Sequence, residues 1–200
     1  MRKQLLEFIN EIKPGSLIVM CGLPGTLKTA ISNEISKIKG FQVLQTDTIR
    51  REVLKGENIF DEKVASNMVK REMVYNEMFR RAENLTMNGR GIILDATFVT
   101  RKLRRKAAEI ASKRGMPLII IQTQCSDDVA IKRILGRGGG GTISNALTEQ
   151  AYYNNKRIFE PVNLDKLKRD YPDLRVKHVI VDTNHNDIAK LTIIHMDEKE

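Results

Sequence analysis

The chain alternates short apolar runs with segments of helical spacing. Five runs read as buried strands, over residues 17–21, 41–45, 92–94, 118–125 and 178–182. Parallel strands need long crossover connections, usually helices, so regular alternation of strands and helices indicates a parallel sheet. We therefore predict an α/β fold of about five parallel strands with helices on both faces, in a single domain spanning residues 1–200.

The segments between these runs predict helices. Apolar residues three and four apart indicate helices over residues 2–12, 61–88, 127–136, 147–159 and 187–197, with others after residues 29 and 100. The four consecutive glycines at 138–141 are too flexible for the interior of an element. Polar residues follow the strands, at 22–29, 47, 95, 125–126 and 182–183. In open α/β sheets ligands bind at the carboxyl ends of strands, so these positions are candidate site residues.

The stretch GLPGTLKT follows the first strand and opens a helix. It nearly matches the phosphate-binding pattern G-x-x-x-x-G-K-[ST], but Leu27 stands where the second glycine belongs. Lys28 would reach the β- and γ-phosphates and Thr29 would bind Mg²⁺. The predicted ATP-binding residues are Gly22, Leu23, Pro24, Gly25, Thr26, Leu27, Lys28 and Thr29, joined by Arg133. We expect Leu27 to turn its side chain away from the phosphates and to pack against neighbouring elements; the alternative is an ordinary strand–helix turn.

Two aspartates follow other predicted strands. Asp47 and Arg50 are three residues apart at a helix start, so both can face one cleft, where Asp47 would accept a proton from an attacking hydroxyl. Asp95 ends the strand ILD, an arrangement typical of a carboxylate that holds Mg²⁺. For each aspartate the alternative is helix capping, although Thr100 is the better cap for the helix after Asp95.

Two groups of basic residues complete the candidate site. Arg133 and Arg137 share a helix face beside the glycine tract, which favours a mobile helical lid over about 126–160 that neutralises a transferring phosphoryl group. Arg101, Arg104 and Arg105 lie in TRKLRRK and would hold a substrate phosphate or a nucleic-acid backbone. Basic surface helices are the alternative in both cases.

The composition limits the partners. The net charge of +9 indicates an anionic partner such as a nucleotide, a phosphorylated substrate or nucleic acid. No apolar run approaches the ~20 residues of a membrane span, so we expect no membrane partner. The amphipathic, charged start shows no secretory signal, and Cys21 and Cys125 read as core or strand-end thiols, so a cytoplasmic location is expected. The sequence leaves the oligomeric state open.

Taken together, GLPGTLKT, DTIR, ILDATF and RILGR make the chain resemble a small AAA-type ATP-binding P-loop kinase, over roughly residues 17–183. It is most similar to the group of polynucleotide 5′-hydroxyl kinases, zeta-toxin-type kinases, chloramphenicol phosphotransferase and seryl-tRNA kinase. The resemblance implies ATP and Mg²⁺ as cofactors. It makes Lys28, Asp47, Arg133 and Arg137 catalytic, assigns Asp47, Arg50, Arg101, Arg104 and Arg105 to the acceptor substrate, and assigns Thr29 and Asp95 to the metal.

The predicted reaction is transfer of the γ-phosphoryl group of ATP to a hydroxyl. RNA or DNA 5′-hydroxyl ends are the favoured acceptor, because of the net charge, the DTIR match and the arginine-rich helix. A small alcohol such as a nucleoside or sugar is the alternative acceptor. A third reading is a non-catalytic nucleotide-binding protein whose loop has decayed at Leu27.

Overall fold

The computed structural model contains the five parallel strands that the apolar runs predict. It describes residues 3–59, 64, 67–136 and 147–200. The parallel strands lie side by side in the order β6-β5-β2-β4-β3. Their bounds are β2 (Leu17–Cys21), β3 (Gln42–Gln45), β4 (Ile92–Asp95), β5 (Leu118–Gln124) and β6 (Val176–Asp182). The predicted α/β fold is confirmed.

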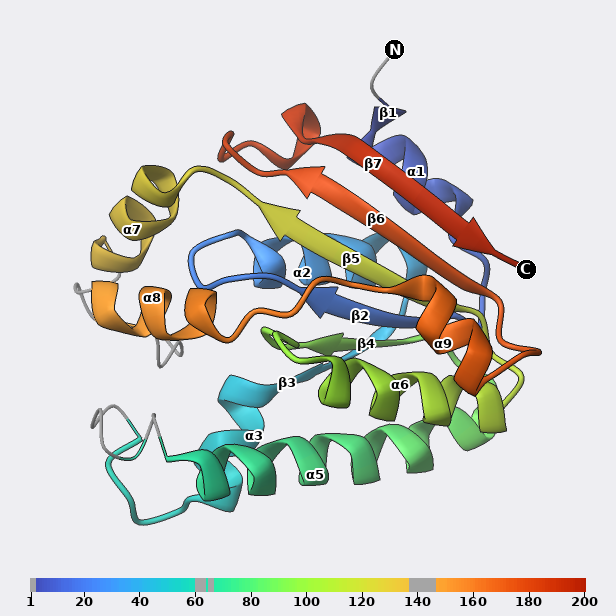
Figure 1. Ribbon diagram of the computed structural model, residues 1–200, viewed down its shortest axis with the longest axis horizontal. Coiled ribbons are helices and arrows are strands. Elements are labelled where there is room, and N and C mark those ends of the chain that lie inside the picture. Colours follow the sequence, from blue (N-terminus) through green and yellow to red (C-terminus); the bar gives the residue numbers. More distant parts are fainter. Residues whose placement is uncertain (1–2, 60–63, 65–66, 137–146) are drawn as a thin grey trace.

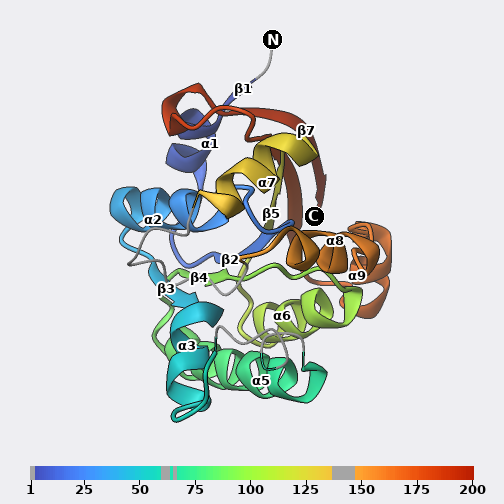
Figure 2. The ribbon, with the colours of Figure 1, turned by 90° about the vertical axis from the view of Figure 1, so that its left-hand side faces the viewer.

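Helices cover both faces of the sheet (Figure 1). One face carries α1 (Leu5–Glu11) and α2 (Lys28–Lys39), and the other carries α5 (Met68–Leu85), α6 (Arg101–Lys113) and α9 (Leu164–Asp170). Three further helices lie at the carboxyl ends of the parallel strands, the edge that faces the viewer in Figure 2: α3 (Thr46–Val53), α7 (Asp127–Leu135) and α8 (Glu149–Arg157).

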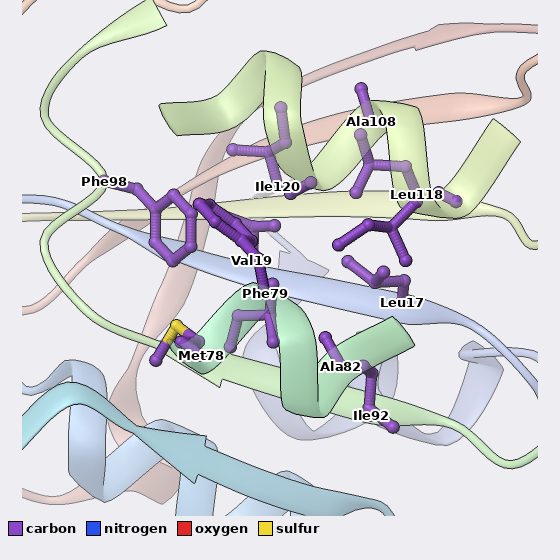
Figure 3. Packing of buried hydrophobic residues seen from close by; sticks show 14 of the residues in the cluster. Leu17, Val19, Met78, Phe79, Ala82, Ile92, Phe98, Ala108, Leu118 and Ile120 are labelled. Carbon is purple, nitrogen blue, oxygen red and sulfur yellow. The ribbon is translucent and has the colours of Figure 1, made fainter. Parts of the chain in front are cut away.

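Successive residues of β2 enter two separate cores, because side chains alternate across a strand. Leu17 and Val19 pack on the side of α5 and α6, in the cluster around Phe79 and Phe98 shown in Figure 3. Ile18 and Met20 join the other cluster, together with residues of α1 and α2. All five residues of β2 are buried, as the continuous apolar run predicts.

The prediction of a closing helix over residues 187–197 is wrong. Only the short 3-10 helix η2 (Ile188–Lys190) forms, and β7 (Thr192–Lys199) then pairs antiparallel with β6. The strand β1 (Lys3–Gln4) pairs with β7, so the described residues form a seven-stranded sheet and α1 starts later than predicted. Leu191 and Ile193 are buried while Ile194 is exposed, a two-residue alternation that favours a strand.

Two other predicted helices are only partly described. The long helix expected over 61–88 is α5, which begins at Met68 and continues into the 3-10 helix η1 (Thr86–Asn88); residues 60–63 and 65–66 lie outside the described residues. The expected lid over 126–160 includes α7 and α8, but 137–146, with Arg137 and the glycine tract, also lie outside. Within the described part of the chain, no helix is long and apolar enough to cross a membrane.

Candidate active site

The loop between β2 and α2 is a tight turn that depends on two glycines. Gly22 and Gly25 have φ angles of 137° and 78°, in the region that favours glycine. A Cβ on Gly22 would lie 2.6 Å from the Thr123 carbonyl oxygen, and one on Gly25 would lie 2.4 Å from that of Ala130. The Gly22 N–H donates to the Thr97 carbonyl at 3.0 Å, which joins this loop to the loop after β4.

Leu27 adopts a left-handed conformation, with φ 63° and ψ 18°, directly before the first residue of α2. This conformation explains why a glycine usually stands at this position, since a Cβ makes it unfavourable by roughly 1–2 kcal/mol. The Leu27 side chain is partly buried and packs against the core cluster of α1 and α2, as expected from the sequence. The loop therefore adopts the left-handed conformation at this position although the residue is not glycine.

The lysine and threonine of the motif occupy the first turn of α2. Lys28 Nζ donates to the Leu23 carbonyl at 2.6 Å, so the side chain folds back along its own loop. The Thr29 hydroxyl hydrogen-bonds the carboxylate of Asp95, at the end of β4. The structure thus brings together two motifs that are 66 residues apart in the sequence.

Asp95 is 5% exposed, and burial raises the pKa of its carboxyl to about 6. Hydrogen bonds from Thr29 and Ser32 and the charge of Lys28 oppose this rise, whereas the nearby charge of Asp47 adds to it. A hydroxyl and a carboxylate in contact are hard oxygen ligands of the kind Mg²⁺ prefers. Mg²⁺ sites in such enzymes use one or two carboxylates, with waters and substrate phosphates completing the shell. These residues therefore fit a Mg²⁺ ion; no group of three or more metal-ligating side chains occurs among the described residues.

Asp47 and Arg50 lie in α3, directly after β3. Asp47 is in the first turn, but the cap position is Gln45, which makes no side-chain cap hydrogen bond. Arg50 is 8% exposed, and its Nε and Nη1 atoms have no hydrogen-bond partner. Burial lowers the pKa of its guanidinium; the charge of Asp47 opposes that shift and the charge of Arg71 adds to it. A buried cation with two unused donors is costly, so Arg50 is suited to receiving an acceptor group.

Sequence reasoning missed the residues around this pair. Arg71 of α5 donates to the Asn155 side chain of α8 at 3.4 Å, which links the acceptor side to the second helix of the expected lid. Tyr75 is buried, and its hydroxyl lies 3.3 Å from that of Thr97. Of these residues, only Thr97 had a signal in the sequence for a place in the site, because it follows the strand that ends in Asp95.

The structure separates the three arginines of α6 that were predicted to hold substrate. Arg101 and Arg105 are exposed, whereas Arg104 is 2% exposed. Arg104 donates at 2.6 Å to the carbonyl oxygens of both Phe98 and Glu160, and at 3.1 Å to that of Pro161. Its donors are occupied by backbone, so we correct the substrate assignment of Arg104 to a structural one.

Arg133 fastens α7 to the nucleotide loop. It donates to the carbonyl oxygens of Gly25 at 3.3 Å, Thr183 at 2.7 Å and His185 at 3.1 Å, and to the Asn186 side chain at 2.9 Å. One of these four bonds reaches the nucleotide loop and the other three reach the segment after β6, so Arg133 ties α7 to both. Its predicted partner Arg137 lies outside the described residues.

Comparison with protein families places most of the chain in one family. The model described as "AAA domain" matches residues 17–162. Curated relatives include "Uncharacterized protein Rv2004c" of Mycobacterium tuberculosis (strain ATCC 25618 / H37Rv), 30% identical over 138 residues, covering 65% of this chain and 27% of that protein. "Uncharacterized protein Mb2027c" of Mycobacterium bovis (strain ATCC BAA-935 / AF2122/97) gives the same values. The chain thus spans 27% of the length of these relatives.

Solved structures share the fold at low sequence identity. A gluconokinase from Sinorhizobium meliloti 1021 has a TM-score of 0.60 and 17% identity, covering 88% of this chain and 86% of that one. Kti12 of Chaetomium thermophilum, solved with ADP-AlF3, has a TM-score of 0.56 and 17% identity, covering 74% and 81%. A putative kinase from Chloroflexus aurantiacus j-10-fl has a TM-score of 0.60 and 18% identity, covering 74% and 83%. The chain therefore belongs to the AAA domain family and has the fold of the small P-loop kinases.

Proposed function

We propose that the protein is an ATP-dependent kinase that transfers the γ-phosphoryl group to a substrate hydroxyl. The observation that carries this proposal is the meeting of the loop residues Lys28 and Thr29 with Asp95, close to the charge of Asp47. A nucleotide-binding loop alone fits many activities. An added carboxylate beside a buried arginine supplies what transfer to a hydroxyl requires, a proton acceptor and a group that positions the alcohol.

The loop holds the phosphates in this account. Successive backbone N–H groups at the start of α2 donate to phosphate oxygens, and Lys28 leaves the Leu23 carbonyl to contact them. Thr29 and Asp95 would hold Mg²⁺, which would neutralise charge on the transferring group. Leu27 contributes its backbone N–H while its side chain stays in the core.

Asp47 and Arg50 act on the acceptor. Asp47 accepts the proton of the attacking hydroxyl, and the nearby charge of Lys28 favours the ionised form of Asp95. Arg50 offers its two unused donors to the acceptor. Their spacing of three residues in α3 places both side chains on one helix face.

We assign the lid to residues of about 126–160. Closing of this segment would exclude water and bring Arg133 and Arg137 to the transferring phosphoryl group. In the structure, Arg133 donates to the carbonyl oxygens of Gly25 and Thr183. A phosphate oxygen would therefore have to replace these carbonyls as the acceptor.

The favoured acceptor is the 5′-hydroxyl end of RNA or DNA. The net charge of +9 and the exposed Arg101 and Arg105 support it, whereas Arg104 no longer does. Structures with this fold include a gluconokinase and a sugar kinase from Janibacter sp. HTCC2649, which favour a small alcohol as the second candidate. A non-catalytic nucleotide-binding protein is the third. We further propose that residues 1–200 act as a single domain in the cytoplasm.

Incubation with γ-labelled ATP and a panel of RNA, DNA, tRNA, a nucleoside and gluconate tests the proposal. Label should appear on a hydroxyl, and Asp47→Asn should lower kcat by roughly 10²–10⁴-fold with little change in ATP affinity. Asp173→Asn, at an exposed turn position outside the candidate site, is the matched control and should retain activity. Bound ATP without transfer to any acceptor would support the non-catalytic reading, and full activity of Asp47→Asn would remove Asp47 as the base.

A further inference from the structure

A groove of about 720 Å³ lies between α6 and α9. We call it the α6–α9 groove. Its exposed basic side chains are Arg101, Lys102, Arg105, Lys106, Lys113 and Lys166. Six exposed basic side chains therefore line it against two acidic ones, Glu109 and Asp170, and the buried Arg104 is not counted because it binds backbone carbonyls. This excess is large enough to make the groove a site for an anion.

Carboxylates compensate part of this charge, and two of the exposed cations pair with partners not on facing sides of the groove: Lys102 with Glu72 of α5 at 2.9 Å, and Lys106 with Glu109 at 3.7 Å. Arg105 pairs with Asp170 at 3.1 Å across the groove, and Lys113 pairs with Glu109 at 2.7 Å along α6. The side chains of Arg105 and Lys113 are 61% and 62% exposed. Exposed pairs of this kind are weak, so an anionic ligand can replace the carboxylates at little cost.

The groove extends away from the candidate active site. Arg101 begins α6, six residues after Asp95, and Lys113 ends it, so the basic side chains follow the whole helix. Thirteen helical residues span roughly 18 Å at ~1.5 Å per residue. α9 lies alongside α6 in both views (Figures 1 and 2). A linear array of cations of this length suits a chain of phosphates better than one compact anion.

We propose that the α6–α9 groove binds the phosphate backbone of a single-stranded nucleic acid whose 5′ end enters the active site near Arg101. The proposal rests on the proposed kinase function and deepens it by naming the path of the acceptor strand. Tyr171 is the one aromatic side chain in the described lining, whereas stacking of successive bases needs several. The groove would therefore contact the phosphates of the nucleic acid and bind it independently of base sequence.

Binding of 3′-labelled single-stranded RNA and DNA, followed by fluorescence anisotropy without ATP, tests the groove. The triple variant Lys106→Ala, Lys113→Ala and Lys166→Ala removes three charges from it. The control variant Lys13→Ala, Lys37→Ala and Lys190→Ala removes three exposed charges elsewhere. Circular dichroism should show both variants folded, since every substitution is at an exposed position.

Each lost contact should flatten the log–log dependence of affinity on salt by roughly 0.7, so the groove variant should lose about 2 from the slope. The control should keep the wild-type slope. Similar behaviour of RNA and DNA would assign the contacts to phosphate alone, and tighter RNA binding would add contacts to the ribose hydroxyls. The proposal would be overturned if the groove variant and the control variant lost the same amount of salt slope, or if polyglutamate displaced the labelled strand as well as unlabelled nucleic acid does.

The groove and the kinase can fail separately. Transfer to a small alcohol together with equal RNA binding by wild type and groove variant would leave the kinase and refute the groove. Groove-dependent RNA binding without transfer to any acceptor would leave the groove and refute the kinase.

Discussion

Neighbouring arginines of α6 should differ sharply in their effect on folding. Arg104→Ala removes the donor from the carbonyl oxygens of Phe98 and Glu160, each at 2.6 Å, and from that of Pro161. Arg105→Ala removes one exposed pair with Asp170. Both substitutions delete one charge and introduce the same helix-favouring residue, so they form a matched pair.

The expected magnitudes follow from these contacts. Hydrogen bonds to a charged group contribute about 1.5–3 kcal/mol each, so two short ones give roughly 3–6 kcal/mol. Part is recovered, because removing Arg104 also removes a buried charge that is costly to desolvate. We expect a loss of about 3 kcal/mol for Arg104→Ala and at most ~0.5 kcal/mol for Arg105→Ala. Arg104→Lys should fall near Arg104→Ala, since one ammonium lacks the fork that reaches several carbonyls.

Urea unfolding measures the difference. With a slope of about 3 kcal/mol/M, Arg104→Ala should lower the midpoint by roughly 1 M, and Arg105→Ala should leave it nearly unchanged. Midpoints of the two variants that differ by less than about 0.3 M, equivalent to ~1 kcal/mol, would refute the structural role of Arg104.

Three further outcomes are expected. Leu27→Gly should be more stable than Leu27→Ala by about 1 kcal/mol in urea unfolding, because glycine alone relieves the left-handed φ of 63°; the reverse order would exclude strain at this position. Burial, and then the charges of His195 and Arg104, lower the pKa of His178 to about 4, and Asp197 opposes this. The folded state therefore disfavours protonation of His178, so the free energy of unfolding is highest above pH ~6.5 and falls by up to about 3 kcal/mol towards pH 4. Denaturation of His178→Gln at several pH values should show a weaker pH dependence, and an unchanged dependence would show that His178 is not its source. Amide exchange in α7 and α8 should slow when ATP and Mg²⁺ are added, whereas exchange insensitive to nucleotide would argue against a lid.

The central sheet could be predicted because its strands are apolar throughout and bounded by polar residues. Burial on both faces leaves a continuous run such as Leu17–Cys21, and the residues after each run then meet at one edge. The closing strand was missed because Thr192–Lys199 is half exposed and its polar positions fit a helix as well. Its signal was the β-branched sequence TII after the buried Leu191.

The candidate site could be predicted only in part. Motif spacing indicated the loop residues and the two aspartates. The burial of Arg104 also had a signal, because Ala107, Ala108 and Ala111 follow at three, four and seven residues and mark the buried face of α6. The left-handed conformation of Leu27 had one signal, the glycine that the phosphate-binding pattern usually has at this position, because glycine favours positive φ. Arg71 comes from a distant helix, so only the fold brings it near Arg50.

Calorimetric titration with ATP and Mg²⁺ tests most directly whether a loop with leucine in place of glycine still binds nucleotide. Wild type and Leu27→Gly should bind with similar affinity, because the side chain packs in the core and only the backbone N–H faces the phosphates. Lys28→Ala should bind far more weakly. Absence of binding in wild type together with binding in Leu27→Gly would contradict the kinase account and show that Leu27 closes the site.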